Sequence, residues 1–410
     1  MPDVSFTNLL VVAAVAVLAP LTVGFFPRLR VPAVVLEIIG GIIIGPSGFG
    51  WVHVDLPVQI LALFGLAFLL FLAGLEIDVH QLRGRLLRFA LLGYLISLVL
   101  GYGAGASFTA AGWVSQPLLI ALILSATALG LVVPVLKDAG QVHSQVGQTA
   151  LAAASIADFT AIVLLSLFFS SSGGSTGARI VVLGAFAGLV AVTGLAVSGA
   201  ARSMRLGQVL VRLQDTTAEI RVRFAVLLLV GFTVLAERFG LESILGAFLA
   251  GAIVGLVDRD SGSHPNFRVK LEAIGYGFLV PVFFVSSGIR LNLTGLLHSP
   301  SALVRVLVFL LALLVARGVP ALLGLRANGP RATLALGLLQ ATSLPFIVTA
   351  AQIGVALGKL SSVTAAALVC AGLLSVLIFP LLALTLLRRG EPAPAPAPAV
   401  AQPVPEPHLM

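Results

Sequence analysis

The sequence predicts an all-α polytopic membrane protein with about 13 transmembrane helices. Three observations support this fold class: the composition, recurring apolar runs, and an unequal distribution of basic residues between alternate connections. Of the 410 residues, 59% are hydrophobic and 10% are charged, whereas an average soluble domain carries about 25% charged residues. So little charge cannot cover the surface of a water-soluble protein of this size. The composition therefore excludes soluble enzymes and nucleic-acid-binding proteins, and it makes the lipid bilayer a partner of the chain.

Apolar runs near twenty residues recur along the whole chain, and this length crosses the hydrocarbon core of a bilayer. The first run has no basic segment before it and no small-residue cleavage site after it, so we expect a mature helix rather than a signal peptide. The thirteen expected spans are approximately 6–26, 33–50, 57–75, 87–109, 117–136, 147–169, 180–201, 222–238, 242–257, 271–288, 302–324, 331–353 and 362–386.

Basic residues mark one side of the membrane. The odd-numbered connections and the C-terminus hold 18 of the 24 Lys and Arg residues, the other side holds five, and Arg317 lies inside a span. Cytoplasmic loops are enriched in Lys and Arg. We therefore expect a multi-pass cell-membrane protein with its N-terminus outside and its C-terminus in the cytoplasm.

Short segments of the first half recur, in the same order, in the second half. The pairs are 40–45 with 250–255, 71–78 with 285–292, and 125–129 with 340–344. The offset corresponds to seven spans, an odd number, so the two copies enter the membrane from opposite sides. Inverted repeats of this kind build many secondary transporters.

The repeat predicts the domain organisation. A transmembrane domain at 1–386 would contain repeat 1 at about 6–169, a linker helix at about 180–201, and repeat 2 at about 222–386. The Pro/Ala-rich segment 387–410 is expected to be a disordered cytoplasmic tail, because such a composition favours an extended chain that packs no core.

Spans 5 and 12 carry helix-weakening residues at matching depth, among them Gly130 and Pro134 in span 5, and Ser343 and Pro345 in span 12. Proline removes a backbone donor and clashes with the preceding turn. Opened backbone at membrane depth is tolerated where it is buried in protein or lines a cavity. We expect two broken helices whose carbonyl oxygens, hydroxyls and dipoles face a bound ion. The alternative is a pair of proline-kinked packing helices.

Two ionisable residues fall mid-span, Asp158 in span 6 and Arg317 in span 11. A charged residue at a helix centre costs about 2.5–3.5 kcal/mol on insertion scales, so each needs a partner or a role. A carboxylate holds either a proton or a small cation, which is the minimum requirement for exchanging H⁺ against a monovalent cation. Arginine cannot release a proton usefully, so Arg317 is expected to be a charge partner or a structural residue. The alternative is an Asp158–Arg317 ion pair that holds two helices in register.

Other chemistry finds little support. Glu37, near the cytoplasmic end of span 2, is expected at the membrane interface, with a vestibule residue as the alternative. No P-loop, Rossmann fingerprint or H-E-x-x-H motif is present, and Cys370 is the one cysteine. An intramembrane aspartyl protease needs two catalytic aspartates, and Asp158 has no second one in the membrane. We therefore expect a protein that is not an enzyme.

Four segments in order, 31–50, 71–78, 245–251 and 281–288, resemble the membrane domain of the monovalent cation:proton antiporters. This family includes Kef-type potassium/proton and Nap-type sodium/proton exchangers, and the resemblance covers about residues 6–386. It implies an inverted-repeat Na⁺/H⁺-antiporter-like fold with two crossed discontinuous helices. It also implies a homodimer, in which a core of spans 4–6 and 11–13 moves against a scaffold of spans 1–3 and 8–10.

The resemblance implies that Asp158 binds proton and cation in turn. Ser125, Thr127, Ser155 and the opened backbone near Thr342 are the expected oxygen ligands. Two departures resemble the electroneutral branch of the family. Electrogenic members have two adjacent aspartates, where this chain has Ala157 before Asp158, and they have a lysine in place of Arg317. The nucleotide-binding regulatory domain of many Kef-type members is not expected in this chain.

The functional expectation is a secondary active transporter that exchanges Na⁺ or K⁺ for H⁺ by alternating access. One cation would move for each proton, with no cofactor apart from the transported ions. One alternative is a cation channel or leak, which would show no obligatory H⁺ movement. The other is a sodium-coupled organic-anion symporter of the same general fold, which would take up a radiolabelled organic substrate.

Overall fold

The computed structural model describes residues 5–26, 31–76, 84–138, 140–142, 144–169, 176–201, 219–260 and 265–388. Within these ranges all regular elements are helical. Seven of the described segments are long and apolar enough to cross a membrane, and one of these, Pro300–Ala356, contains two of the predicted spans. Shorter apolar helices accompany them.

The helices follow the predicted spans in order. The first half contains α1 (Thr7–Phe25), α2 (Ala33–Ile44), α3 (Leu56–Glu76), α4 (Gly84–Ala110), α5 (Pro117–Ser125), α6 (Leu129–Asp138), α7 (Gln145–Phe169) and α8 (Thr176–Ala201). The second half contains α10 (Ile220–Arg238), α11 (Ser243–Asp260), α12 (Pro265–Ile274), α13 (Val280–Ile289), α14 (Leu293–Leu297), α15 (Pro300–Gly318), α16 (Leu325–Gln340), α17 (Pro345–Ala356) and α18 (Ser362–Arg388). Each of the thirteen predicted spans coincides with one helix or with consecutive helices, so the predicted fold class is confirmed.

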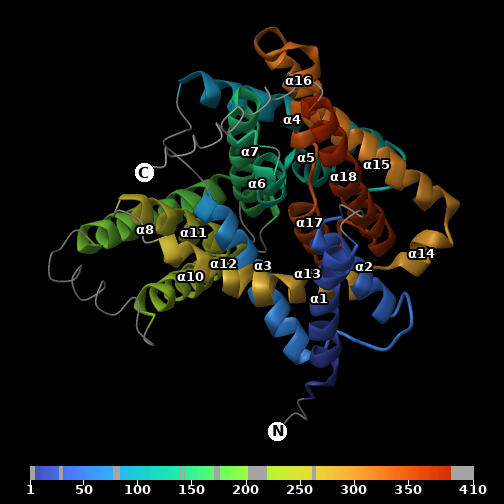
Figure 1. Ribbon diagram of the computed structural model, residues 1–410, viewed down its shortest axis with the longest axis horizontal. Coiled ribbons are helices and arrows are strands. Elements are labelled where there is room, and N and C mark those ends of the chain that lie inside the picture. The colour runs from blue at the N-terminus through green and yellow to red at the C-terminus, as the bar shows by residue number, and fades with distance from the viewer. Residues whose placement is uncertain are drawn as a thin grey trace, which may run out of the picture.

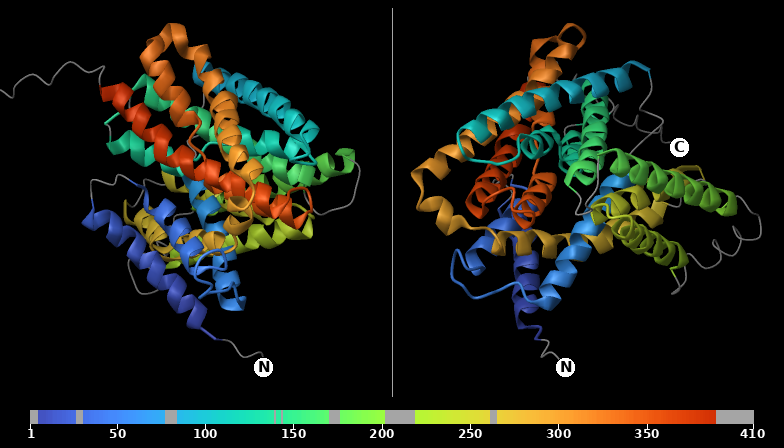
Figure 2. Two further views of the ribbon diagram at one scale, coloured as in Figure 1. Left: turned by 90° about the vertical axis from the view of Figure 1, so that its right-hand side faces the viewer. Right: turned by 180° about the vertical axis from the view of Figure 1, so that it is seen from behind.

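The helices form two layers, which the left view of Figure 2 separates. The scaffold layer consists of α1–α3 and α10–α13, and the core layer consists of α4–α7 and α15–α18. Helix α8 contacts both α7 and α11 and projects to one side with α10 and α11 in Figure 1. Residues of both layers form one large apolar cluster, so the interface between the layers is packed by side chains.

Two helix boundaries differ from the expected ones. Helix α2 ends at Ile44 rather than near residue 50, because Pro46 has no N–H to continue the helical hydrogen bonds and disfavours helical backbone before it. Helix α15 continues through a 3₁₀ turn, Val319–Gly324, into α16. The latter is kinked where Gly329 has a φ of 74°, a left-handed conformation that glycine adopts without steric cost.

The scaffold layer is joined at two glycine crossings. Helix α2 meets α13 where Gly41 lies against Gly288, so that a methyl group on Gly288 would stand 3.0 Å from the Cα atom of Gly41. Helix α11 meets α3 where a methyl group on Gly251 would overlap the backbone oxygen of Phe71, and one on Gly74 would overlap the other helix in turn. The internal repeat relates Gly41 to Gly251 and Gly74 to Gly288. The same crossing is therefore built twice, each time from one helix of each half, as an inverted repeat requires.

The crossings make a prediction about stability. Gly251→Ala is expected to destabilise the protein by about 1–3 kcal/mol or more, because the added methyl group overlaps backbone that cannot rotate away. Gly231→Ala on α10 is the matched control, since a methyl group there meets nothing within 4 Å and alanine favours helix over glycine by about 1 kcal/mol. Melting temperature in detergent measures both. Equal melting temperatures for the two variants would contradict the prediction.

Candidate functional site

Two helices of the core layer are interrupted. The first stops at Ser125, the end of α5, and resumes at Leu129, the start of α6. The second stops at Gln340 and resumes at Pro345, where proline is favoured because the first turn of a helix does not use its N–H. The breaks fall within spans 5 and 12, so the crossed discontinuous helices implied by the sequence are confirmed.

The two breaks contact each other directly. The Ala128 N–H donates to the carbonyl oxygen of Thr342 at 2.9 Å, and the Thr127 hydroxyl donates to the carbonyl oxygen of Gln340 at 2.7 Å. Backbone groups freed by the interruptions therefore find partners across the crossing, as buried peptide groups must.

Asp158 lies on α7 beside the first break. Its Oδ1 accepts the Thr127 N–H at 3.3 Å, and its Oδ2 accepts the Leu129 N–H at 3.2 Å. These N–H groups stand at the start of α6, where unpaired donors and the helix dipole favour a negative charge. The first break thus presents N–H groups to Asp158 and stabilises its ionised form. Lone pairs of the carboxylate that accept no N–H are left for a proton or a cation.

Arg317 is 1% exposed, in the last turn of α15. Its Nε and Nη2 donate to the Thr127 hydroxyl at 2.9 and 2.6 Å, and its Nη1 donates to the Ser97 hydroxyl at 3.1 Å. A longer contact joins Nε to the carbonyl oxygen of Gln340 at 3.4 Å. Thr127 therefore stands between the two charges, because its hydroxyl binds Arg317 and its N–H binds Asp158. In the part of the chain that the structure describes, Asp158 and Arg317 form no direct ion pair.

A cavity of about 60 Å³ lies beside Asp158, between the two layers. A water molecule needs about 10–15 Å³ on this measure, so the cavity has room for a small ion with a few waters. Its walls are formed by the first break and α6, by α7 and α17, and by the scaffold helices α2, α3 and α13 with the turn before α13. The lining residues are Val34, Leu69, Leu70, Ala73, Thr127, Ala128, Leu129, Gly130, Leu131, Asp158, Ile162, Tyr276, Phe284, Pro345 and Phe346.

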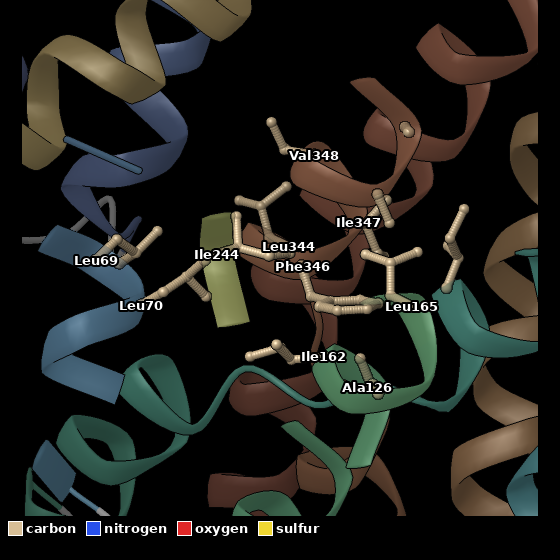
Figure 3. Packing of buried hydrophobic residues seen from close by; sticks show 14 of the residues in the cluster. Leu69, Leu70, Ala126, Ile162, Leu165, Ile244, Leu344, Phe346, Ile347 and Val348 are labelled. Carbon is tan, nitrogen blue, oxygen red and sulfur yellow. The ribbon is translucent and has the colours of Figure 1, made fainter. Parts of the chain in front are cut away.

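The surroundings of the cavity are mainly apolar. Figure 3 shows Phe346 of α17 lying near Ile162 of α7 and Ala126 of the first break, opposite Leu69 and Leu70 of α3. An apolar wall strengthens the electrostatic interaction of a carboxylate with whatever cation or proton it holds. Among the described residues no group of three or more His, Cys, Asp or Glu could hold a metal ion. One carboxylate with neutral oxygens suits a monovalent cation better than a tightly held divalent one.

The structure brings four of the expected site residues to the cavity: Asp158, Thr127, Gly130 and Pro345. Pro134 lies further along α6. Ser155 is buried about one turn before Asp158 on α7.

The remaining hydroxyls lie behind the cavity wall. The Ser125 hydroxyl lies 3.2 Å from that of Tyr94. The Thr342 hydroxyl, in the second break, donates to the carbonyl oxygen of Leu338 near the end of α16 at 3.1 Å. The Ser343 hydroxyl is buried without a hydrogen-bond partner in the described structure. Thr342 therefore contributes its carbonyl oxygen to the crossing.

Sequence reasoning missed several contacts of the site. On α4, Ser97 accepts a hydrogen bond from Arg317, and Tyr94 is hydrogen-bonded to Ser125. Tyr276 lines the cavity. No sequence pattern distinguishes them, because the contacts of Ser97 and Tyr94 join residues 220 and 31 positions apart on different helices. Sequence reasoning also missed the burial of Glu37, which is 5% exposed and whose Oε2 has no hydrogen-bond partner in the described structure. The cause is the packing of α2 against both α1 and α13, which the sequence does not display.

Thr127→Val should destabilise the protein by about 2–3 kcal/mol, because it removes the acceptor of two charge-assisted hydrogen bonds from a buried guanidinium. Thr127→Ser, which keeps the hydroxyl, is expected to recover most of that loss. Thr193→Val is the matched control, since the Thr193 hydroxyl donates only to Leu189 of its own helix at 2.8 Å. Thermal melting in detergent separates the three variants. Equal melting temperatures for Thr127→Val and Thr193→Val would show that the hydrogen bonds of Thr127 do not stabilise the protein.

Crossed discontinuous helices, a repeat in opposite orientations, and a carboxylate in a cavity between two layers together form the architecture that is typical of inverted-repeat secondary transporters. The family model described as "Sodium/hydrogen exchanger, transmembrane" matches residues 13–388. The chain belongs to this sodium/hydrogen exchanger family.

Relatives and a solved structure support this assignment. YjbQ of Bacillus subtilis is 33% identical over 412 residues, covering 95% of this chain and 64% of YjbQ, so the chain spans less than two thirds of that relative. The Na(+)/H(+) antiporter of Enterococcus hirae is 30% identical over 272 residues, covering 65% of this chain and 68% of that protein. The solved structure of the sodium proton antiporter MjNhaP1 from Methanocaldococcus jannaschii has a TM-score of 0.65 at 20% identity, covering 93% of this chain and 98% of that one. This last likeness shows the fold.

Proposed function

We propose that the protein exchanges a monovalent cation, Na⁺ or K⁺, for H⁺, and that Asp158 binds the two in turn. The observation that carries this proposal is the position of Asp158, the carboxylate among the cavity-lining residues, at the first helix break. A proton or a cation can occupy that carboxylate, and each excludes the other. Family membership and the antiporter names of relatives support the same conclusion.

Exchange in this proposal follows alternating access. The cavity has walls from both layers, so a displacement of the core layer against the scaffold layer would close it on one side of the membrane and open it on the other. In this proposal the core layer moves against the scaffold layer only when a proton or a cation neutralises Asp158. Because both loaded forms carry the same net charge, one cation moves for each proton and the exchange is electroneutral. Arg317 stays charged in both forms and sets the local potential.

The remaining assignments are part of the same proposal. The bias of basic residues places the N-terminus outside and the C-terminus in the cytoplasm, and the protein works as a homodimer in the cell membrane. The exchange needs no cofactor and makes or breaks no covalent bond. The transmembrane domain would act with repeat 1 at about 6–169, repeat 2 at about 222–386, a linker helix between them and a cytoplasmic tail at 387–410.

Purified protein in liposomes that enclose a pH-sensitive dye tests the proposal. With a proton gradient imposed, NaCl, KCl or choline chloride is added in turn, and membrane voltage is clamped with valinomycin and K⁺ gradients. Dye recovery with Na⁺ or K⁺ but not choline, unchanged by voltage, is expected for electroneutral exchange, and it names the ion. Recovery that follows voltage would contradict the stoichiometry. No recovery with any cation would refute the antiporter and favour an organic-anion symporter, to be tested by uptake of labelled carboxylates.

A further inference from the structure

Tyr276 is presented to the cavity by an unusual piece of backbone. Helices α12 and α13 form one continuous rod except for a π-helical turn, Gly275–Leu279. A π turn inserts an extra residue into a helix and frequently marks a functional site. Gly275 sits so close to α3 that a methyl group would collide with the side chain of Leu72, which fixes the wide turn against the scaffold. Tyr276, the next residue, lines the cavity and is 42% exposed.

The Tyr276 hydroxyl reaches across to the core layer. A methyl group placed on Gly130 would have this hydroxyl oxygen as its one neighbour within 4 Å, at 3.4 Å. Gly130 follows Leu129, whose N–H binds Asp158. The phenol of a scaffold residue therefore lies over the first turn of α6, at the boundary across which the two layers are proposed to move.

A charged cluster lies one helical turn beyond the cavity on two helices. On α3, Glu76 follows the cavity-lining Ala73, and on α12, Glu272 precedes Tyr276 by four residues. Arg268 connects the two sides, since it contacts Glu272 at 2.7 Å and Glu76 at 3.7 Å. Tyr276 thus lines the cavity that contains Asp158 and lies one helical turn from Glu272 of this cluster.

We propose that Tyr276 controls access to Asp158 and positions the incoming cation. Its ring separates the charged cluster from the cavity, and its hydroxyl oxygen replaces one water of a partly hydrated monovalent cation on the way to the carboxylate. The face of the ring also attracts a cation. This assignment rests on the proposed exchange function, and its two parts, positioning and access, are tested separately.

The positioning role is tested with Tyr276→Phe, which keeps the ring and removes the hydroxyl. In the liposome assay the KM for the cation is expected to rise about five-fold, the equivalent of one neutral hydrogen bond, while the maximal rate changes less than about two-fold. Tyr102→Phe is the control, because Tyr102 is exposed on α4 and does not line the cavity. An unchanged KM in Tyr276→Phe overturns the positioning role. Absence of exchange by the unmodified protein would instead refute the proposed function.

The access role is tested without transport. Cys370 is the one cysteine of the chain, so Cys370→Ser with Ala73→Cys leaves a single thiol on the cavity wall. The rate at which a charged methanethiosulfonate labels this thiol is expected to rise at least about ten-fold when Tyr276→Ala is added, because the ring that restricts access to the cavity is removed. Adding Tyr276→Phe, which preserves the packing, should leave the rate unchanged. Equal rates with and without Tyr276→Ala overturn the access role, whether or not exchange is measurable.

Discussion

Asp158→Asn is expected to reduce cation-dependent proton movement at least about 100-fold, to the level of protein-free liposomes. Asparagine has the shape of aspartate but neither releases a proton nor carries the charge that attracts a cation. Asp158 supplies the carboxylate of the cavity wall, so no neighbour there takes over both roles. The amide would also set an NH₂ group against one of the two N–H donors of the first break.

The control for this variant is Asp55→Asn. Asp55 precedes α3, accepts the Val58 N–H at 3.1 Å and pairs with Asn8 at 2.9 Å. Asparagine is as good a helix cap as aspartate, so this variant should keep both its fold and its exchange. The measurement is dye recovery in liposomes, after size-exclusion chromatography has shown that both variants are folded. Full exchange by Asp158→Asn would require a different proton carrier and would refute the mechanism.

Arg317→Ala is expected to lower the free energy of unfolding by about 2–5 kcal/mol, the cost of emptying the space of a large buried side chain and leaving its hydrogen-bond partners unpaired. The side chain donates to hydroxyls on α4 and on the first break, and to a carbonyl oxygen at the second break. Its removal leaves these partners buried and unpaired, and it leaves a cavity the size of the arginine side chain beyond Cβ. The crossing of the two broken helices would lose one of the side chains that hold it to α4, while the Ser125–Tyr94 hydrogen bond would remain.

Arg317→Lys separates charge from geometry. Lysine keeps the positive charge, but a single ammonium group cannot reproduce the fork that reaches Thr127 and Ser97 together. Its stability should therefore lie between that of the unmodified protein and that of Arg317→Ala. Arg326→Ala, at an exposed position of α16, is the control and should change stability by less than about 0.5 kcal/mol. If Arg317→Ala and Arg326→Ala had the same melting temperature, the hydrogen bonds of Arg317 would not stabilise the crossing.

The order of the helices could be predicted because the hydropathy of each segment can be read directly from the sequence. Apolar length and the distribution of Arg and Lys located the spans, and the helix-weakening residues around Thr127 and Thr342 located both breaks. Asp158 stood out because a carboxylate in the middle of a span is costly. These features depend on position along one helix, which a sequence displays directly.

The orientation of each helix about its axis could not be predicted. Where a helix is apolar on all sides, no periodicity shows which face meets another helix. The burial of Glu37 could therefore not be predicted, and Ser125 is bound to Tyr94 rather than lining the cavity. The contact between Arg317 and Ser97 joins residues 220 positions apart, and no local pattern predicts a partner at that distance.

The paired glycine crossings have a consequence for biosynthesis. Gly74 on α3 packs against α11, and Gly41 on α2 packs against Gly288 of α13. The partner of each early helix is therefore synthesised only about 180–250 residues later in the chain. At about 5–20 residues per second, translation supplies those partners only after roughly ten seconds to a minute. During that interval the first helices expose their narrow glycine faces to lipid. The scaffold therefore assembles only after α13, which ends at residue 289 of 410, has been made. Truncated chains that end before α13 should be degraded rather than accumulate.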